Sequence, residues 1–416
     1  MPHPPPIVFT DASLLEPATG ERREGAWVAV SDGRISATGT GGVPTDRHGE
    51  VIDLQGRTLM PGLIDAHVHI NAVTADLGAI AEWSPSYVAA KAAHALEAML
   101  GRGFTTVRDV AGADYGCAAA LEEGVLVGPR LKFGGKALSQ TGGHGDVRPP
   151  GRHVLDDHPC CPSLEVICDG VAECRRAARH QLRTGADHIK IMLSGGVSSP
   201  TDRVDSTQFA ADEIAAIVEE AEAAGRYVTG HAYTARAVNR GLELGVRCIE
   251  HGNLIDDRSV ELFNARGAFL VPTLVTYQAL ASEGAEHGLP PESQAKVDDV
   301  LRHGLDALRR AHDGGVQLVF GTDLLGGMQR RQSEEFTIRA QVQPTIDVIR
   351  AATSTAAKLI GMHGQVGTVA PGAIADLIVV DGDPLADIRM LVEPDTHLPV
   401  IMTGGRCYRN RLTQAT

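Results

Sequence analysis

Two histidines separated by one residue form the first pair in this chain that could do chemistry. They stand in Asp65-Ala66-His67-Val68-His69, at the end of an apolar stretch typical of a β-strand. Side chains two positions apart on a strand point to the same side, so both imidazoles can reach one ion. Neutral imidazole is a common ligand of zinc and related metals. The pair predicts a metal site at the end of a strand.

Further polar residues lie within or at the ends of later predicted strands. Lys190 interrupts the apolar run 189–193, where a buried cation is costly unless something neutralises or uses it. Each residue alone could be a hydrogen-bonded core residue, a lysine that extends to solvent, or a helix N-cap. Together they indicate one metal centre shared by several strands. The other members of the set are His231, His251 and Asp323.

The middle of the chain, residues 61–363, alternates strand-like and helix-like segments. Eight strands with helices between them are the pattern of a (β/α)8 TIM-type barrel, whose sites lie at the carboxyl ends of the strands. A doubly wound open sheet is the alternative, but no GxGxxG motif follows a strand. The expected strands are Leu63–His67, Thr105–Asp109, Arg130–Phe133, His188–Leu193, Tyr227–Gly230, Val246–Ile249, Phe269–Thr273 and Gln317–Gly321. The expected helices are Tyr87–Arg102, Val171–Thr184, Ala210–Ala224, Thr234–Leu244 and Asp298–His312.

The two ends of the chain differ from the middle. Residues 1–60 and 364–416 contain short strand-like pieces separated by Gly and Asp, which predicts a small β-sandwich domain built from both termini. These pieces are Ala26–Ser31, Arg34–Ala37, Ala375–Val380 and Pro399–Met402. Two long connections, 134–169 and 276–296, show no clear periodicity, and long loops after barrel strands are usually functional lids.

Composition excludes several classes of partner. The net charge of −14, with no basic patch, argues against nucleic acid, and the aromatic fraction of 4% argues against a base-stacking surface. No apolar run approaches the roughly 18 residues of a membrane-spanning helix, and the N-terminus has no secretory signal. The seven cysteines are odd in number and contain no CxxC pair, which favours reduced thiols in a cytoplasmic protein.

Several motifs resemble the amidohydrolase superfamily over essentially the whole chain. They are PGLIDAHVH at 61–69, HIKIMLSGG at 188–196, His231, His251, GTD at 321–323 and VGTVAPGAIADLIVVDGDPL at 366–385. The resemblance implies that Lys190 carries a carbamate and bridges two divalent metal ions, with zinc as the default. One metal would take His67, His69, Lys190 and Asp323, and the other would take Lys190, His231 and His251.

The resemblance also implies a mechanism. A hydroxide held between two divalent ions attacks a carbonyl that a metal polarises. Asp323 accepts the proton of this hydroxide and passes it to the leaving nitrogen. Asp65 is a candidate hydrogen-bond partner for a ligand imidazole, with a simple structural role as the alternative.

Three motifs narrow the subclass. HAYT at 231–234, TGGHGD at 141–146 and KIMLSGGVSSP at 190–200 resemble the dipeptidase branch. That branch splits Xaa-Pro dipeptides or N-acyl amino acids and includes enzymes that hydrolyse ochratoxin-type amides. By this resemblance, His144 hydrogen-bonds the carbonyl oxygen in the transition state and Tyr233 binds the terminal carboxylate of the substrate. The family often forms oligomers, which implies a homo-oligomer here.

Other readings remain open at this stage. A cyclic-amide hydrolase related to imidazolonepropionase, or a deaminase, would need no bridging lysine, so Lys190 argues against both. A hydantoinase-like ring opener is compatible with Lys190. A metal-free scaffold protein should have lost ligands, and none of the six is missing. His188, two residues before Lys190, is expected to be a hydrogen-bonded structural residue deeper in the barrel.

Overall fold

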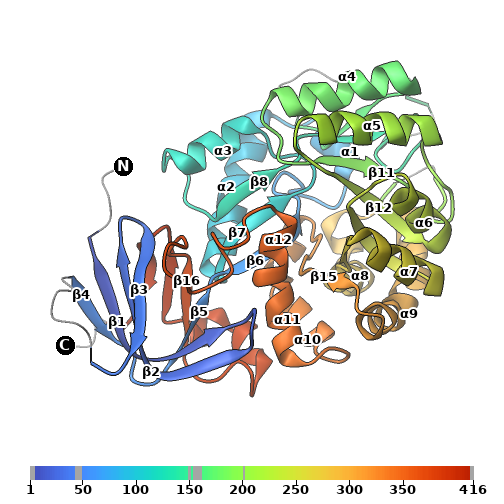
Figure 1. The fold of residues 1–416 in the computed structure, drawn as a ribbon. Helices are drawn as coiled ribbons and strands as arrows, with labels where there is room; N and C mark the ends of the chain where they lie inside the picture. Colours follow the sequence, from blue (N-terminus) through green and yellow to red (C-terminus); the bar gives the residue numbers. More distant parts are fainter. Residues whose placement is uncertain (1–4, 43–48, 149–150, 153–161, 200–201, 413–416) are drawn as a thin grey trace.

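The computed structural model describes residues 5–42, 49–148, 151–152, 162–199 and 202–412. Strands from the two ends of the chain share one eight-stranded sheet, in the order β18-β17-β16-β5-β1-β2-β3 with β4 paired to β1. Figure 1 shows the blue N-terminal strands beside the red strand β16. The expected strand pieces at both ends are confirmed. The strands are β1 (Ile7–Glu16), β2 (Glu21–Ser31), β3 (Arg34–Thr40), β4 (Glu50–Asp53), β5 (Thr58–Pro61), β16 (Leu377–Val380), β17 (Val400–Thr403) and β18 (Arg406–Asn410).

The junction between the two ends is the antiparallel pair β5 and β16, with Leu377 opposite Pro61. Leu59, Leu377 and Val379 are buried in a core that belongs to this sheet. Strand β6 (Leu63–Val68) begins two residues after β5. The terminal sheet therefore holds the start of the strand that carries the two histidines.

All eight strands expected in the middle of the chain are present. They pair in parallel within two sheets, β6-β7-β8 and β10-β9-β11-β12-β13-β14-β15. The strands after β6 are β7 (Phe104–Asp109), β8 (Arg130–Phe133), β11 (Ile189–Met192), β12 (Val228–Thr234), β13 (Cys248–Leu254), β14 (Phe269–Val271) and β15 (Gln317–Leu318). Strands β6, β7 and β11 are buried along their whole length, as expected of strands covered on both faces.

The expected helices are confirmed between the strands. The longer of them are α2 (Pro85–Gly101), α3 (Tyr115–Glu122), α4 (Gly170–Arg183), α5 (Ala211–Ala223), α6 (Ala235–Glu243), α7 (Asp257–Arg266), α8 (Leu274–Glu283) and α9 (Pro291–Asp313). Helix α2 begins at a proline and buries Val88, Ala92, Leu96 and Met99, a spacing that gives one apolar face. Among the described residues, no helix combines the length and the apolar character needed to cross a bilayer.

Shorter elements complete the chain after β15. The helices are α10 (Glu334–Arg339), α11 (Thr345–Ala351), α12 (Ser354–Leu359) and α13 (Pro394–His397), with α1 (Leu77–Ile80) following β6. Three short 3-10 turns are η1 (Ala285–His287), η2 (Gly326–Arg331) and η3 (Ile388–Leu391).

Backbone hydrogen bonds connect the two sheets of the middle region on both sides. On one side, Ala66 N donates to Phe320 O at 2.9 Å and Asp323 N donates to His67 O at 2.8 Å. On the other side, Asp187 N donates to Phe133 O at 2.8 Å. The segment after β15 is thereby held against the end of β6.

The two long connections contain more structure than their sequences indicate. Strands β9 (Ala137–Ser139) and β10 (Glu165–Ile167) lie within 134–169 and join the seven-stranded sheet. Helices α8 and α9 occupy most of 276–296. The prediction that these stretches are long loops is therefore wrong in part. Strands of three residues, such as β9 and β10, are too short to show alternation. Residues 149–150 and 153–161 of the first connection lie outside the described residues.

Gly321 allows the close approach of the 320–323 segment to β6. A Cβ atom added there would lie 2.3 Å from Val271 Cγ1 and 2.8 Å from His67 Cβ. We predict that Gly321→Ala lowers the free energy of unfolding by about 1–3 kcal/mol, the usual effect of overpacking, as measured by urea denaturation. Gly42→Ala is the control, because a Cβ atom at Gly42 meets nothing within 4 Å. Equal stability of the two variants would contradict the steric argument.

Candidate active site

The polar residues predicted from the sequence converge on one pocket. Its lining includes residues from β11, β12 and β13, from the end of β6 and from the segment that follows β15. All six predicted metal ligands, together with His144 and Tyr233, line it. Parallel strands present their carboxyl ends at the same edge, which explains how residues far apart in sequence meet here.

Three side chains at the base of the pocket lie close enough to share one cation. The possible ligand atoms of His67, His69 and Asp323 all lie within 4.8 Å of one another. The two Nε2 atoms are 3.3 Å apart, and Asp323 Oδ1 lies 3.2 Å from the first and 3.1 Å from the second. The alternation of β6 brings the two rings to the same side, as the HxH spacing predicts.

The hydrogen bonds behind the two rings determine where their lone pairs point. His67 Nδ1 donates to Glu250 Oε2 at 2.7 Å, and His69 Nδ1 donates to the carbonyl of Ala111 at 2.9 Å. With Nδ1 engaged behind it, each ring directs its Nε2 toward the other ring and toward the carboxylate of Asp323. Three electron-pair donors that face one another repel unless a cation lies between them. The donor set therefore fits a divalent metal ion.

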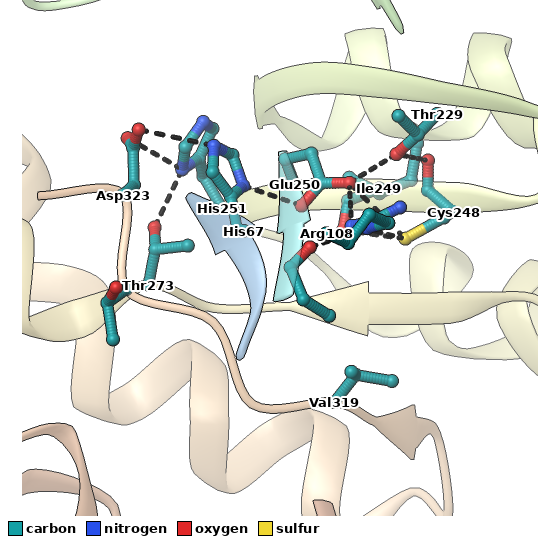
Figure 2. A network of polar contacts seen from close by, with 12 residues as sticks. His67, Arg108, Thr229, Cys248, Ile249, Glu250, His251, Thr273, Val319 and Asp323 are labelled. Atoms are coloured by element: carbon teal, nitrogen blue, oxygen red, sulfur yellow. Dashed lines mark hydrogen bonds and ion pairs between the residues drawn. The ribbon is translucent and has the colours of Figure 1, made fainter. Parts of the chain in front are cut away.

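Glu250 holds His67 through a buried ionic network, shown in Figure 2. Its Oε1 accepts a hydrogen bond from Arg108 at 2.6 Å and another from the hydroxyl of Thr229. Arg108 also donates to the carbonyl of Ala66 at 2.5 Å, within β6 itself. Although burial opposes ionisation, Arg108 and His67 hold the pKa of Glu250 well below its usual range. The carboxylate stays charged and fixes the tautomer of His67.

Lys190 is buried on β11 and lines the same pocket. Within the part of the chain that the structure describes, it forms no hydrogen bond or ion pair. Burial is the main reason that the pKa of Lys190 is lowered, against the attraction of Glu250 and Asp323. An amine with a lowered pKa and no partner among the described residues, beside predicted metal ligands, is suited to react with carbon dioxide.

His231 and His251 form the second part of the predicted ligand set. They come from the neighbouring strands β12 and β13, and their ring centroids are 4.6 Å apart. His251 Nδ1 forms a hydrogen bond of 2.8 Å with the hydroxyl of Thr273, and His231 Nε2 lies 3.2 Å from the carbonyl oxygen of Gly195. Burial lowers the pKa of both rings well below the usual value. Both are therefore neutral and able to offer a lone pair to a metal.

The backbone is strained at three positions at or beside the predicted metal ligands. His251, Thr273 and Asp323 have φ angles of 78°, 49° and 53° in the left-handed region, which residues other than glycine rarely adopt. Such conformations cost about 1–3 kcal/mol each and cluster at functional sites. For Asp323, the strained turn is held by the bond from its N–H to His67 O. The strain aims the carboxylate at the two imidazoles.

The charges around Asp323 favour its ionised form. Burial would raise its pKa, but His67, His69 and His251 together hold the pKa of Asp323 well below its usual range. Conversely, burial would lower the pKa of His69, and Asp323 outweighs it and raises that pKa. The carboxylate is thus negatively charged and ready to bind a cation.

His144 lies above His231, and the two rings stack with centroids 4.1 Å apart. Its Nδ1 is 2.9 Å from the hydroxyl of Ser199, which hydrogen-bonds to Asp202. The ring rests on Gly196, where an added Cβ atom would lie 2.1 Å from it. These contacts leave Nε2 as the ring nitrogen available to a ligand in the pocket.

Tyr233 packs between His231, His251 and a second tyrosine. Its ring centroid is 4.8 Å from that of His231 and 5.2 Å from that of His251. The hydroxyl of Tyr277, on α8, donates to the hydroxyl of Tyr233 at 3.2 Å. Both tyrosines line the pocket, so this side offers two adjacent hydroxyl groups.

Of two neighbouring residues, Asp65 has the structural role given as its alternative, and His188 lacks, within the described part of the chain, the hydrogen bond expected of it. Asp65 does not reach an imidazole, because its carboxylate accepts from the backbone N–H of His67, the hydroxyl of Thr322 and the amide of Gln332. His188 is buried as expected, but neither ring nitrogen has a hydrogen-bond partner among the described residues, and the ring stacks on Tyr227 instead.

Sequence reasoning missed two carboxylates of this region. Glu250 directly precedes the predicted ligand His251, and this adjacency was the only available signal. Glu165, on β10, is 6% exposed and lines the pocket. Burial raises the pKa of Glu165 to about 7, against the attraction of His69, Lys136 and Lys190. No sequence pattern indicated Glu165, because its strand was not expected.

The chain matches the model of the amidohydrolase family over residues 58–406. It is 32% identical to ochratoxinase of Aspergillus niger over 97% of this chain and 87% of that protein. A solved prolidase in complex with N-methylphosphonate-L-proline is 45% identical, with a TM-score of 0.95 over 97% of this chain and 100% of that chain. A Xaa-Pro dipeptidase with bound methionine is 28% identical, with a TM-score of 0.87 over the same shares.

The family model covers most of the chain and includes every residue of the pocket described above. The fold, the order of the strands that carry the predicted ligands and the similarity to these proteins all indicate the same family. The chain therefore belongs to the amidohydrolase family.

Proposed function

We propose that this protein is a metal-dependent hydrolase that cleaves the amide bond of dipeptides of the Xaa-Pro type or of N-acyl amino acids. The observation that carries the proposal is the convergence of His67 Nε2, His69 Nε2 and Asp323 Oδ1 within 3.1–3.3 Å, with Lys190 in the same pocket. The similarity to proteins named prolidase, Xaa-Pro dipeptidase and ochratoxinase supports the substrate class.

Two divalent cations, with zinc as the first choice for imidazole and carboxylate ligands, would be held by the six predicted ligands. His67, His69, Lys190 and Asp323 would hold one, and Lys190, His231 and His251 would hold the other. Bound metal would supply Lewis-acid activation of water and of the amide carbonyl.

In the proposed site, Lys190 carries a carbamate group. Its Nζ, in the unprotonated form, would form a bond to the carbon of carbon dioxide and lose one proton, which yields an anionic group with two oxygen atoms. This reaction would replace a buried basic group, costly in an apolar strand when charged, with an anionic ligand that both cations could share. The lowered pKa of Lys190 and its lack of a partner among the described residues support this step.

The remaining steps fall to residues of this chain. The oxygen of water forms a bond to the carbonyl carbon, the C–N bond breaks, and a proton must move to the leaving nitrogen. Asp323 carries this proton between the two. His144, through Nε2, binds the carbonyl oxygen as negative charge develops there. Tyr233, supported by Tyr277, binds the carboxylate at the far end of the substrate.

The proposal extends to the architecture. We propose that residues 61–363 close into a (β/α)8 barrel, for which the backbone bonds at β6 and β8 are the support. Residues 1–60 and 364–416 form the β-sandwich domain around their shared sheet. We also propose that the protein is a cytoplasmic homo-oligomer. The five described cysteines, all without a disulfide, support the cytoplasmic location.

Lys190→Ala should remove bound metal and activity together, because the bridging ligand is lost. We expect metal content, measured by plasma mass spectrometry, to fall at least several-fold, and a short carboxylic acid to restore part of the activity. Lys132→Ala is the matched control, since Lys132 is a half-exposed strand lysine paired with Asp187 outside the pocket. Full metal content and activity in the Lys190 variant would exclude the bridging role.

Glu250→Gln should weaken metal binding, because an amide cannot accept hydrogen bonds from both Arg108 and His67 with full negative charge. Loss of a group that orients a ligand typically costs about 10- to 100-fold in metal affinity. Competition with a chromophoric chelator measures this change. If the variant were only less stable, with unchanged metal affinity, Glu250 would be a structural residue and not a positioning one.

A substrate panel tests the function directly. Zinc-loaded protein is incubated with Xaa-Pro dipeptides, N-acyl amino acids, hydantoins and an imidazolone, and release of amino acid or ring-opened product is measured. We expect cleavage of the linear amides alone. Turnover of only the cyclic compounds would instead identify a cyclic-amide hydrolase, and the roles given to His144 and Tyr233 would be wrong.

A further inference from the structure

The pocket contains one acidic side chain that the proposed reaction does not use. Glu165 points into it from β10 and is buried, yet within the described part of the chain it has no ion pair. The nearby ammonium group of Lys136 donates to the hydroxyl of Ser163 at 2.9 Å. A cation beside a buried carboxylate would favour its charged form, and such a cation would have to come from a ligand, because Glu165 has no ion pair among the described residues.

The loop that carries His144 is built directly against this carboxylate. A Cβ atom added at Gly145 would lie 2.7 Å from Glu165 Cγ and 2.9 Å from Ser139 Cβ. Gly145 therefore allows the backbone beside His144 to pack on Glu165. The loop that carries His144, the residue proposed to bind the carbonyl oxygen, therefore lies directly against Glu165.

Two kinds of polar group line the pocket beside the predicted metal ligands. Glu165 lies near enough to His69 and Lys190 for their positive charges to lower its pKa against the effect of burial. The hydroxyls of Tyr233 and Tyr277 lie on the side of His231 and His251. A dipeptide has a matching polarity, because its ammonium group lies on the carbonyl side of the amide bond and its carboxylate lies on the nitrogen side. An N-acyl amino acid has the carboxylate but not the ammonium group.

We propose that Glu165 binds the α-ammonium group of the substrate, and that this contact selects dipeptides with a free amino terminus over N-acyl amino acids. The inference rests on the proposed function and narrows its substrate class. Glu165 acts here in binding, and the proton transfer to the leaving nitrogen stays with Asp323.

Two compounds that differ only in this group provide the test. Alanyl-proline carries the ammonium group, and propionyl-proline has a hydrogen atom in its place. We expect Glu165→Gln to lower kcat/KM for alanyl-proline about 10- to 100-fold, the usual worth of a hydrogen bond between charged groups, mainly through KM. The value for propionyl-proline should change less than about threefold, and metal content should be unchanged.

Glu335→Gln is the matched control, because Glu335 is also a buried carboxylate with a raised pKa, of about 8 through burial, but it does not line the pocket. It should leave the preference between the two compounds as in the wild type. Equal losses on both compounds in Glu165→Gln would overturn the inference, because they would indicate a role in the chemical step or in metal binding. An unchanged preference would overturn it as well.

Binding to chelator-treated protein separates this inference from the proposed function. Calorimetry should show tighter binding of alanyl-proline than of propionyl-proline to the wild type, and loss of that difference in Glu165→Gln. If the zinc-loaded wild type cleaves neither compound, the proposed function fails. The calorimetric preference still decides the role of Glu165: its presence supports the ammonium site, and its absence refutes it.

Discussion

The convergence of electron-pair donors at one point is the constraint on which the rest of this structure depends. Two imidazole nitrogens and a carboxylate oxygen lie within 3.1–3.3 Å of one another, although all three repel in the absence of a cation. Each is held from behind, His67 by Glu250, His69 by the carbonyl of Ala111, and Asp323 by its backbone bond to β6. The hydrogen bonds of the fold thereby oppose the repulsion and preserve an arrangement suited to metal.

This arrangement requires unfavourable features nearby. Arg108 and Glu250 are both fully buried, and the attraction between them offsets a desolvation cost that neither could bear alone. His251, Thr273 and Asp323 adopt backbone conformations that are unfavourable for residues with side chains. Packing elsewhere, including the fully buried strands β6, β7 and β11, supplies the stability that keeps these features in place.

On the proposed function, the same pocket would account for how one family can serve different amides. The predicted metal ligands would act only on the carbonyl and the attacking water, which all amides share. Selectivity would then depend on the tyrosine hydroxyls and on Glu165, which also line the pocket. A substrate with charges at both termini would satisfy both groups, whereas a substrate with one charge would leave Glu165 without a cationic partner.

The sequence alone determined the eight strands and their order, and it predicted the polar residues that meet where they end. These follow from local properties, because the alternation of a strand places His67 and His69 on one side and the order of strands brings His231, His251 and Asp323 to one edge. Only the tertiary structure decided that Glu250, not Asp65, holds His67, and that Glu165 faces the pocket. Contacts across 183 positions of sequence leave no local pattern, and strands β9 and β10 of three residues each are too short to show one. Such partners are chosen by packing in three dimensions.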